Sequence, residues 1–372
     1  MTSIIYVGMD VHTTNYTLCC YSMEDDRFFA EVQVEPDAKN ILKYLARIEK
    51  QQSRDCRIVC GYEAGCLGYS LYHQLHAHGI DCVILAPTTM MTKPGKRIKT
   101  DRRDARLISK CLAFHTYSPV YIPTEVGDAV KEYIRMRDDA NSALARVKQQ
   151  IIAFCIRHGK IHDGKSYWTN KHLEWLSSLD LGNKILSEVL QEYLIRYYQL
   201  REQVDMYDMR INELAQAEPY RQKVEKLGCF RGIAAHTALS FCVEVGDFRR
   251  FATAQQFASY LGLVPGECSS GDKQQYTGIT KAGNSHLRKL LVETAQVFGR
   301  SATKSGKSVA LKERQAKCDS LTVAYADKAN ARLKKKYFKI AMRSKVNIAK
   351  TAVAREMACF IWGMMTDNIS CA

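Results

Sequence analysis

The order of strand-like and helical segments in the first third of the chain constrains its fold most. Three β-rich segments come first, at hairpin spacing, over residues 4–11, 16–21 and 28–34. Helical and strand patterns then alternate, at residues 40–49, 57–62, 67–78 and 82–86. Three antiparallel strands followed by helix–strand units predict a mixed α/β sheet that is covered by helices.

Two acidic residues stand where strands of this predicted sheet end. Asp10 lies at the end of the first strand, and Glu63 directly follows the fourth. Open α/β sheets build their functional sites at strand ends, so these carboxylates are candidates for chemistry. The segment order, with acids at these two places, is that of a ribonuclease-H-type sheet.

A second pair of acids lies between residues 96 and 108, inside a dense run of lysines and arginines. Thr100 is a good helix N-cap, and a helix starting there places Asp101 and Asp104 on one face, one turn apart. Like charges that close repel unless a cation lies between them, and a hard divalent cation is the usual one. The alternative is a solvated helix start in which each aspartate pairs with a nearby arginine: Arg102, Arg103 or Arg106.

The charge of the chain is strongly positive and uneven. Its 372 residues carry a formal net charge of +15, and the pI is about 9.1. Residues 288–355 hold 18 lysines and arginines against 4 acids, which is +14 of that total. Such a concentration favours a polyanionic partner, with Lys334, Lys335 and Lys336 as the densest cluster. A solvated basic face is the alternative.

The sequence also indicates which environment to expect. None of the 14 cysteines forms a Cys-x-x-Cys pair, so we expect buried free thiols in a reducing compartment and no zinc site. Asp10 interrupts the N-terminal apolar segment early, so we expect no secretion signal. The longest apolar run, residues 357–365, is far shorter than the ~20 residues of a membrane span. We therefore expect a cytoplasmic protein without a membrane segment.

Beyond residue 125 the pattern becomes helical. Apolar residues at spacings of three and four over residues 130–152 and 185–214 predict an antiparallel helix pair or coiled coil. Such a pair could serve as an oligomer arm, a nucleic-acid support or core packing. A further compact unit begins near residue 224 and contains a polar loop with two adjacent serines before a glycine. We expect three domains: 1–124, a helical coiled-coil linker at 125–222, and a mainly α unit at 223–372.

Taken together, these motifs are similar to those of the 110 family of insertion-sequence transposases, which includes pilin-gene invertases and bridge-RNA-guided recombinases. The resemblance spans nearly the whole chain, in the family's order. It rests on these segments: Gly8-Met9-Asp10, Tyr62-Glu63-Ala64, Lys99-Thr100-Asp101-Arg102-Arg103-Asp104-Ala105, Tyr260-Leu261-Gly262-Leu263-Val264-Pro265, Ser269-Ser270-Gly271, Ile279-Thr280-Lys281-Ala282-Gly283-Asn284 and Leu287-Arg288.

The resemblance implies a RuvC-like N-terminal domain, whose metal-binding tetrad holds Mg²⁺: Asp10, Glu63, Asp101 and Asp104. It also implies that Ser270 in the C-terminal transposase domain is the nucleophile, with its neighbour Ser269 left open. Expected partners are double-stranded DNA, a structured guide RNA encoded by the element and further copies of this chain, as a dimer or tetramer. The residues expected to contact nucleic acid are Lys99, Arg102, Arg103, Lys281, Arg288, Lys334, Lys335 and Lys336.

Three functions are compatible with these residues. The first is a site-specific DNA recombinase that acts through Ser270 and the metal tetrad. The second is a metal-dependent, structure-specific nuclease in which Ser270 only shapes a turn. The third is a nucleic-acid-binding scaffold without catalysis, which the ordered placement of four acids disfavours. A covalent protein–DNA adduct would distinguish the first function from the second.

Overall fold

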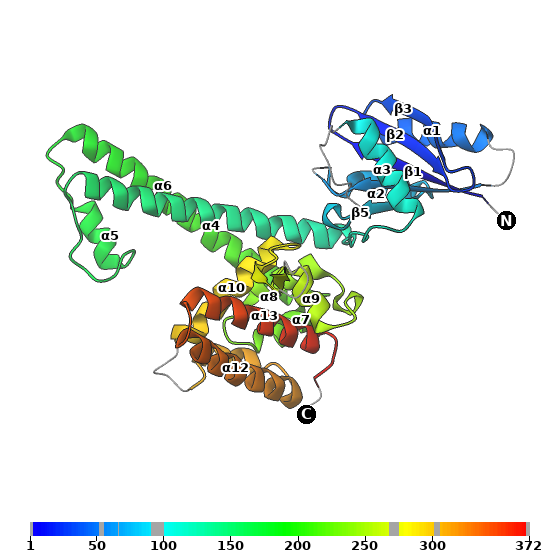
Figure 1. Ribbon diagram of the computed structural model, residues 1–372. Coiled ribbons are helices and arrows are strands. Elements are labelled where there is room, and N and C mark those ends of the chain that lie inside the picture. Colours follow the sequence, from blue (N-terminus) through cyan, green and yellow to red (C-terminus); the bar gives the residue numbers. More distant parts are fainter. Residues whose placement is uncertain are drawn as a thin grey trace. The chain divides into compact units, whose positions relative to one another are not determined.

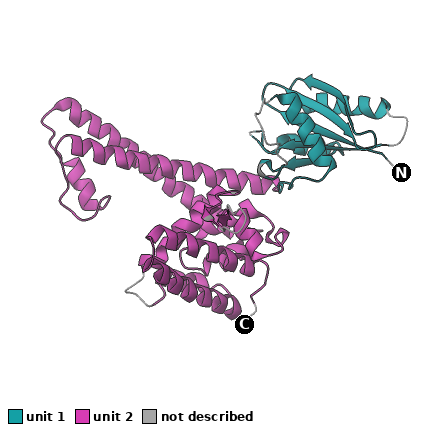
Figure 2. Cartoon of the chain, viewed as in Figure 1, with its two compact units in different colours: residues 1–122 teal, residues 123–372 magenta. Residues whose placement is uncertain are grey.

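The computed structural model describes residues 3–51, 56–65, 67–90, 100–267, 275–300 and 306–369 (Figure 1). The chain divides into two compact units, residues 1–122 and 123–372 (Figure 2). The helical middle segment therefore belongs to the same unit as the C-terminal part. The proposed domain boundary at residue 222 stays a prediction.

The first unit is built on a five-stranded mixed sheet with the order β3-β2-β1-β4-β5. β1 pairs antiparallel with β2, and β2 with β3, whereas β1, β4 and β5 run parallel. This arrangement confirms the predicted mixed sheet. The elements of the unit are β1 (Ser3–Val11), β2 (Tyr16–Ser22), β3 (Arg27–Val34), α1 (Ala38–Gln51), β4 (Cys56–Glu63), α2 (Ser70–Ala77), β5 (Asp81–Leu85), a 3-10 turn η1 (Pro87–Thr89) and α3 (Asp101–Ala113).

The two faces of the sheet are buried by different helices because successive side chains of a strand point to opposite sides. Ile5, Val7 and Met9 of β1 pack in one core cluster with apolar residues of α1 and α2. Tyr6, on the other face, belongs to the cluster that contains Ile108 of α3. The alternation places the side chain of Asp10 on the face that α3 covers.

Gly8 allows α3 to lie directly against β1. A Cβ atom at this position would stand 2.0 Å from the carbonyl oxygen of Ala105 and 2.4 Å from the amide nitrogen of Ser109. Only glycine fits such a close approach of two backbones. As a result the first turn of α3 lies near the end of β1.

In the second unit, α4 (Glu125–Arg157) and α6 (Lys184–Gln216) run side by side in opposite directions, with α5 (Asn170–Ser177) at their far end (Figure 1). The side chains of Thr124 and Asn183 cap the two long helices. A guanidinium–carboxylate pair also joins them, with Arg137 Nε 2.7 Å from an oxygen of Asp208. The predicted antiparallel helix pair is confirmed. Its core is formed by Leu144, Val147, Ile151, Phe154, Leu190, Leu194 and Tyr197.

The remainder of the second unit is a compact, mainly helical body with one short hairpin. Its core includes the fully buried Phe241, Phe257 and Phe298. None of the helices that the structure describes is long and apolar enough to cross a membrane. The elements are α7 (Arg221–Gly228), α8 (Ala235–Val245), η2 (Phe248–Arg250), α9 (Ala254–Tyr260), β6 (Pro265–Glu267), β7 (Tyr276–Ile279), α10 (Ser285–Arg300), α11 (Val309–Gln315), α12 (Ser320–Ala341) and α13 (Val346–Met365).

Candidate functional site

Asp10 and Glu63 lie beside each other at the carboxyl ends of two neighbouring parallel strands. The β1–β4 register pairs Met9 with Tyr62, so the next residues on the two strands are these two acids. The side chain of Asp10 is only 14% exposed, whereas Glu63 is exposed. The sheet therefore brings both predicted acids to the carboxyl ends of adjacent strands, where Asp10 is mostly buried and Glu63 is exposed.

Asp101 and Asp104 occupy the first turn of α3, as predicted, and both are half-buried. Thr100 stands at the N-cap position, but its hydroxyl makes no capping hydrogen bond. Burial raises the pKa of Asp10, and the negative charges of Asp104 and Asp101 raise it further, against the opposing effect of His12. Three carboxylates thus interact electrostatically at the point where α3 meets β1.

The arginines of α3 make ion pairs that the sequence did not indicate. Nε of Arg102 and Nε of Arg106 lie 3.2 and 2.7 Å from the two carboxylate oxygens of Glu31 on β3. The alternative prediction is that arginines of this helix pair with the aspartates at its start. Arg102 and Arg106 pair with Glu31 of β3 instead. These pairs link α3 to β3 at the surface of the unit.

His12 is the member of the site that sequence reasoning missed. Its Nε2 lies 3.3 Å from Oδ2 of Asp10. Ligand atoms of Asp10, His12 and Asp101 all lie within 4.8 Å of one another. Within the described ranges this is the one such group of three or more acidic, histidine or cysteine side chains, and it does not include Glu63 or Asp104. The only sequence signal was the position of a histidine two residues after Asp10.

The chemistry of this group fits a divalent cation. Oδ2 of Asp10 is buried and accepts no hydrogen bond, and the same holds for the hydroxyl of Thr17. Thr17 is 2% exposed and stands opposite Asp10 in the β1–β2 register, so its side chain is on the same face of the sheet. Buried oxygens without partners cost free energy, and a cation or the water bound to it would satisfy them.

The serine-bearing loop belongs to the second unit. Ser269 and Ser270 lie outside the described residues, as does Lys99. The loop connects β6 to β7, and Arg288 holds the base of that hairpin through hydrogen bonds to the carbonyls of Leu261 (2.9 Å) and Ala282 (2.8 Å). Lys281, beside Ala282, is exposed and has a φ of 56°. Arg288 thus has a structural role at the hairpin, beside any contact with nucleic acid.

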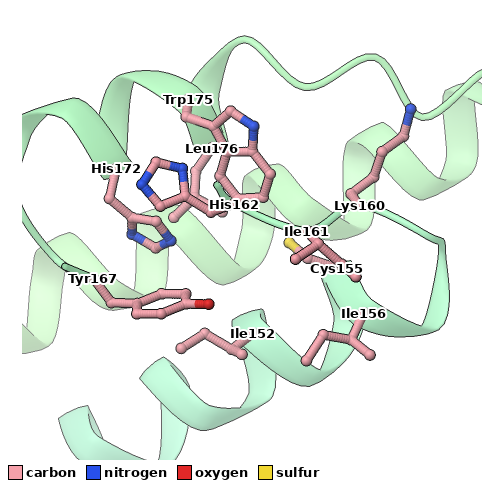
Figure 3. Close-up of a pocket in the computed structure, with 10 residues that line it drawn as sticks. All are labelled: Ile152, Cys155, Ile156, Lys160, Ile161, His162, Tyr167, His172, Trp175 and Leu176. Atoms are coloured by element: carbon pink, nitrogen blue, oxygen red, sulfur yellow. The ribbon is translucent and has the colours of Figure 1, made fainter. Parts of the chain in front are cut away.

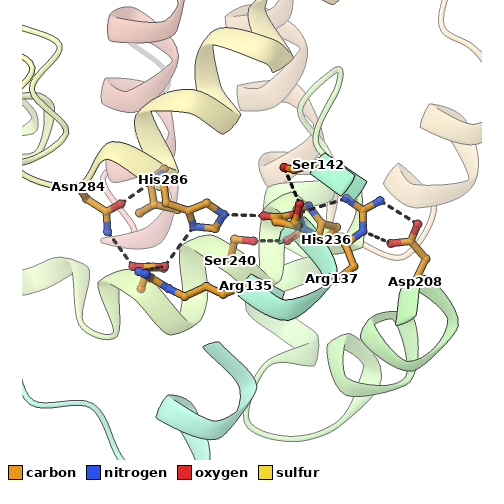
Figure 4. A network of polar contacts seen from close by, with 11 residues as sticks. Arg135, Arg137, Ser142, Asp208, His236, Ser240, Asn284 and His286 are labelled. Atoms are coloured by element: carbon orange, nitrogen blue, oxygen red, sulfur yellow. Dashed lines mark hydrogen bonds and ion pairs between the residues drawn. The ribbon is translucent and has the colours of Figure 1, made fainter. Parts of the chain in front are cut away.

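A buried polar network, absent from the sequence-based predictions, ties this hairpin region to α4 (Figure 4). Nε2 of His286 lies 2.7 Å from Asp138, and Nδ1 of the same ring lies 3.1 Å from Glu244. Asp138 also lies 2.9 Å from Nε2 of His236, and Glu244 accepts from Arg135 at 2.8 Å. The network joins α4, α8 and α10.

The pKa values of three members of this network, His286, Glu244 and Asp138, indicate that these three groups are charged. Burial lowers the pKa of His286, but hydrogen bonds to Asp138 and Glu244 outweigh it and raise the pKa to about 9. Burial raises the pKa of Glu244, but bonds from His286 and Asn284 outweigh it, and the pKa is about 2. For Asp138 the histidines overcome burial in the same way and lower the pKa. A protonated His286 therefore lies between two carboxylates.

The three consecutive lysines of α12 differ in exposure and in their partners. Lys336 pairs with Glu356 at 2.5 Å, and Lys334 is half-buried, whereas Lys335 is exposed. Lys335 instead shares an exposed stripe with other cations at spacings of four, three and four residues, which is one face of a helix. This cationic stripe consists of Lys328, Arg332, Lys335 and Lys339.

A cavity of about 120 Å³ lies between α5 and the end of α4 (Figure 3). Tyr167, Trp175 and two histidines line it, together with aliphatic side chains. Nδ1 of His172 accepts a hydrogen bond from the Trp168 amide at 3.2 Å, and burial, followed by the nearby His162, lowers the pKa of His172. Among the described residues that line this cavity there is no carboxylate, so it does not resemble the site on the sheet.

Comparisons with known proteins match both units. A sequence model described as "Transposase IS116/IS110/IS902 family" matches residues 225–314, and a DEDD transposase model of the IS110 type, described as "Transposase", matches residues 7–156. The putative transposase y4qE of Sinorhizobium fredii is 36% identical over 307 residues, 82% of this chain and 75% of the relative. The transposase for insertion sequence element IS1533 of Leptospira borgpetersenii is 32% identical over 340 residues, 90% of this chain and 95% of the relative.

Proposed function

This chain belongs to the IS110 family of insertion-sequence transposases, and from that premise we propose that it is a site-specific DNA recombinase that mobilises an insertion sequence. Ser270 is the nucleophile in this proposal, and a Mg²⁺ site at the edge of the sheet assists it. The acids of the site are Asp10, Glu63, Asp101 and Asp104. The observation that carries the proposal is the convergence of Asp10 from β1 and Asp101 from α3, whose ligand atoms lie within 4.8 Å of each other at a place where a buried oxygen of Asp10 accepts no hydrogen bond.

The first unit supports a ribonuclease-H-like, RuvC-type fold for this site. The strand order β3-β2-β1-β4-β5, with three antiparallel strands and two parallel additions, is the order expected of such a sheet. Its acids lie at the ends of β1 and β4 and on the helix that covers them. Carboxylates in this position would hold a divalent cation, which supplies Lewis-acid polarisation of a scissile phosphate.

The proposed chemistry is a reversible phosphoryl transfer. The Ser270 hydroxyl oxygen forms a bond to phosphorus, the bond from phosphorus to a DNA oxygen breaks, and that DNA oxygen takes up a proton and leaves as a hydroxyl. The serine proton is transferred to a base, for which a carboxylate of the site is the candidate. Attack of another DNA hydroxyl on the phosphoserine restores the serine and joins new ends, so the number of phosphoester bonds is conserved.

The alternative is a metal-dependent, structure-specific DNA nuclease in which water attacks and no covalent intermediate forms. The observation that favours it is that Asp10, His12 and Asp101 come together within the first unit alone. A RuvC-like nuclease would need no residue from the serine-bearing loop. The two functions therefore differ in their dependence on Ser270.

A suicide DNA substrate that traps the cleaved end distinguishes the two. We expect the wild-type chain to form a denaturation-resistant adduct with one DNA end in the presence of Mg²⁺. Ser270→Ala should lose adduct and recombination together while still binding DNA, and Ser269→Ala, the matched neighbour, should be far milder. Asp101→Asn should lose cleavage altogether. Cleavage by Ser270→Ala, combined with none by Asp101→Asn, would establish the nuclease.

Transposases bind DNA, and we propose two further partners for this one. A structured RNA encoded by the element would act as guide, and copies of the chain would assemble as a dimer or tetramer. Purification with and without ribonuclease, followed by sequencing of the bound RNA and a mass measurement in solution, tests both. Recombination that is unaffected by ribonuclease would contradict RNA guidance.

A further inference from the structure

We propose that His12 is a nitrogen ligand of the divalent cation, so that the site favours a first-row transition-metal ion over Mg²⁺. This inference rests on the proposed metal site and adds a residue outside its four carboxylates. His12 follows the last residue of β1 and begins the turn to β2, where its backbone amide donates to the carbonyl of Asn15 at 3.0 Å.

The separation of His12 and Asp10 fits neighbouring ligands of one ion. Neighbouring ligand atoms of an octahedral ion at about 2.1 Å lie about 3 Å apart, and opposite ones lie about 4.2 Å apart. Nε2 of His12 is 3.3 Å from Oδ2 of Asp10, and the atoms of Asp10, His12 and Asp101 lie within 4.8 Å of one another. The separation of 3.3 Å also exceeds the 2.7–2.9 Å of a charge-assisted hydrogen bond.

The unsatisfied oxygens around His12 point to an absent ligand. Oδ2 of Asp10 accepts no hydrogen bond although it is buried. The hydroxyl of Thr17, which is 2% exposed, has no partner either and lies across from Asp10 on the same face. Two buried oxygens on one face of a sheet that accept no hydrogen bond are rare in a protein unless something else satisfies them. A cation at Asp10, with its bound water, would do so.

The chemistry of imidazole then decides which ion is favoured. Mg²⁺ prefers oxygen ligands, whereas imidazole suits transition metals, which bind nitrogen more strongly along the first-row series. For ligation Nε2 must carry a lone pair, so the ring proton rests on Nδ1. The side chain of His12 is 47% exposed, which leaves the ring room to turn toward the ion. The alternative role of His12 is to form an ion pair with Asp10 without binding a metal ion.

Pulsed EPR of Mn²⁺ bound to the full chain, purified without a histidine tag, tests the inference directly. We expect nitrogen modulation from a coordinated imidazole in the wild-type spectrum and its loss in His12→Ala. His78→Ala, which removes an exposed histidine at the end of α2, should keep it. His12→Ala should also weaken Mn²⁺ binding by at least about 10–100-fold, the range for loss of a residue that only orients a ligand. Mg²⁺ binding should weaken less.

The outcomes separate this inference from the proposed function. Mn²⁺ binding that Asp10→Asn abolishes, but that shows no nitrogen modulation or keeps it in His12→Ala, would overturn the role of His12 and leave the carboxylate site standing. Mn²⁺ binding that is indifferent to Asp10→Asn would overturn the metal site itself, and the role of His12 with it. His12→Gln keeps a side chain of similar size but removes the imidazole nitrogen. It should therefore lack the nitrogen modulation as His12→Ala does, which shows that the ligand rather than the side-chain volume is needed.

Discussion

Asp10 is held in a state that is costly for an isolated carboxylate. Burial and the charges of Asp104 and Asp101 raise its pKa above the ordinary value, and His12 opposes them only in part. A raised carboxyl pKa means that the folded chain favours the protonated form and that stability is lost as pH rises through that pKa. At neutral pH the ionised Asp10 therefore destabilises the chain unless a cation compensates.

Asp10→Asn should accordingly raise the thermal unfolding temperature in the presence of a chelator, because the amide removes the buried negative charge. The same variant should lose the additional stability that Mn²⁺ or Mg²⁺ confers on the wild-type chain. Thermal unfolding with and without each ion measures both effects. A variant less stable than wild type in chelator would show that Asp10 is structural rather than a metal ligand.

At the scale of elements, two contacts between segments distant in sequence position the functional regions. Gly8 lets α3 approach β1, and the network around His286 joins α10 to α4 and α8. The first contact brings Asp101 toward Asp10. The second holds the helix that follows the serine-bearing hairpin. Each contact is specific enough to be broken by one substitution.

Gly8→Ala should separate α3 from β1, because its Cβ would meet backbone atoms of Ala105 and Ser109 at 2.0 and 2.4 Å. We expect a loss of about 1–3 kcal/mol in the free energy of unfolding, together with weaker Mn²⁺ binding. Gly65→Ala is the matched control in the same unit, since its nearest contact would be an ordinary 3.8 Å. Denaturant titration and metal titration check the two effects. Equal stability of both variants would contradict the tight contact.

The network predicts a pH dependence with a definite sign. The folded-state pKa of His286, about 9, exceeds the ordinary value of 6.5, so its stabilisation is complete below pH 6.5 and is lost as pH rises through 9. Glu244, with a pKa of about 2, loses its contribution only as pH falls through 2. Thermal stability should therefore fall between pH 6.5 and 9. His286→Gln should be less stable at pH 6.5 and should lack most of that fall, and an unchanged pH profile would contradict the network.

For the whole molecule, the uneven distribution of positive charge along the sequence is the main electrostatic feature. The net charge of +15 is concentrated in the C-terminal part of the sequence, but ion pairs use some of that charge. Glu356 forms ion pairs with both Lys336 and Arg332. The cationic stripe on α12 leaves Lys335 and Lys339 exposed on one helical face. Exposed cations on one helical face point to the same side and can contact phosphates together, whereas consecutive residues of a helix point in different directions.

Lys335→Gln combined with Lys339→Gln should weaken DNA binding and reduce its log–log salt slope by up to about 0.9 for each duplex phosphate that the variant no longer neutralises. Lys312→Gln combined with Lys317→Gln removes the same charge from exposed positions outside the stripe and serves as control. Binding titrations at several salt concentrations measure the slopes. Identical slopes in the two double variants would mean that net charge, rather than the stripe, governs affinity.

Local sequence determined the elements of this protein and the placement of its acids. The strand and helix patterns of the first unit depend on apolar periodicity within short windows. β1, β2 and β4 begin and end close to their predicted positions, and α3 begins where Thr100 predicted a helix start. The one-turn spacing of Asp101 and Asp104, and the strand ends at Asp10 and Glu63, follow from the same local rules. The helix pair α4 and α6 was predictable because its apolar repeat is long.

Tertiary structure alone decided which side chains meet. Arg102 and Arg106 pair with Glu31, some 70 residues away along the chain, rather than with neighbouring aspartates. Asp138 meets His286 across 148 residues, and His12 joins Asp10 and Asp101 because Gly8 lets a helix backbone reach the strand. Such contacts depend on packing distances and side-chain reach, which local windows do not contain. Periodicity therefore determines the elements, whereas the approach of distant backbones determines the composition of a site.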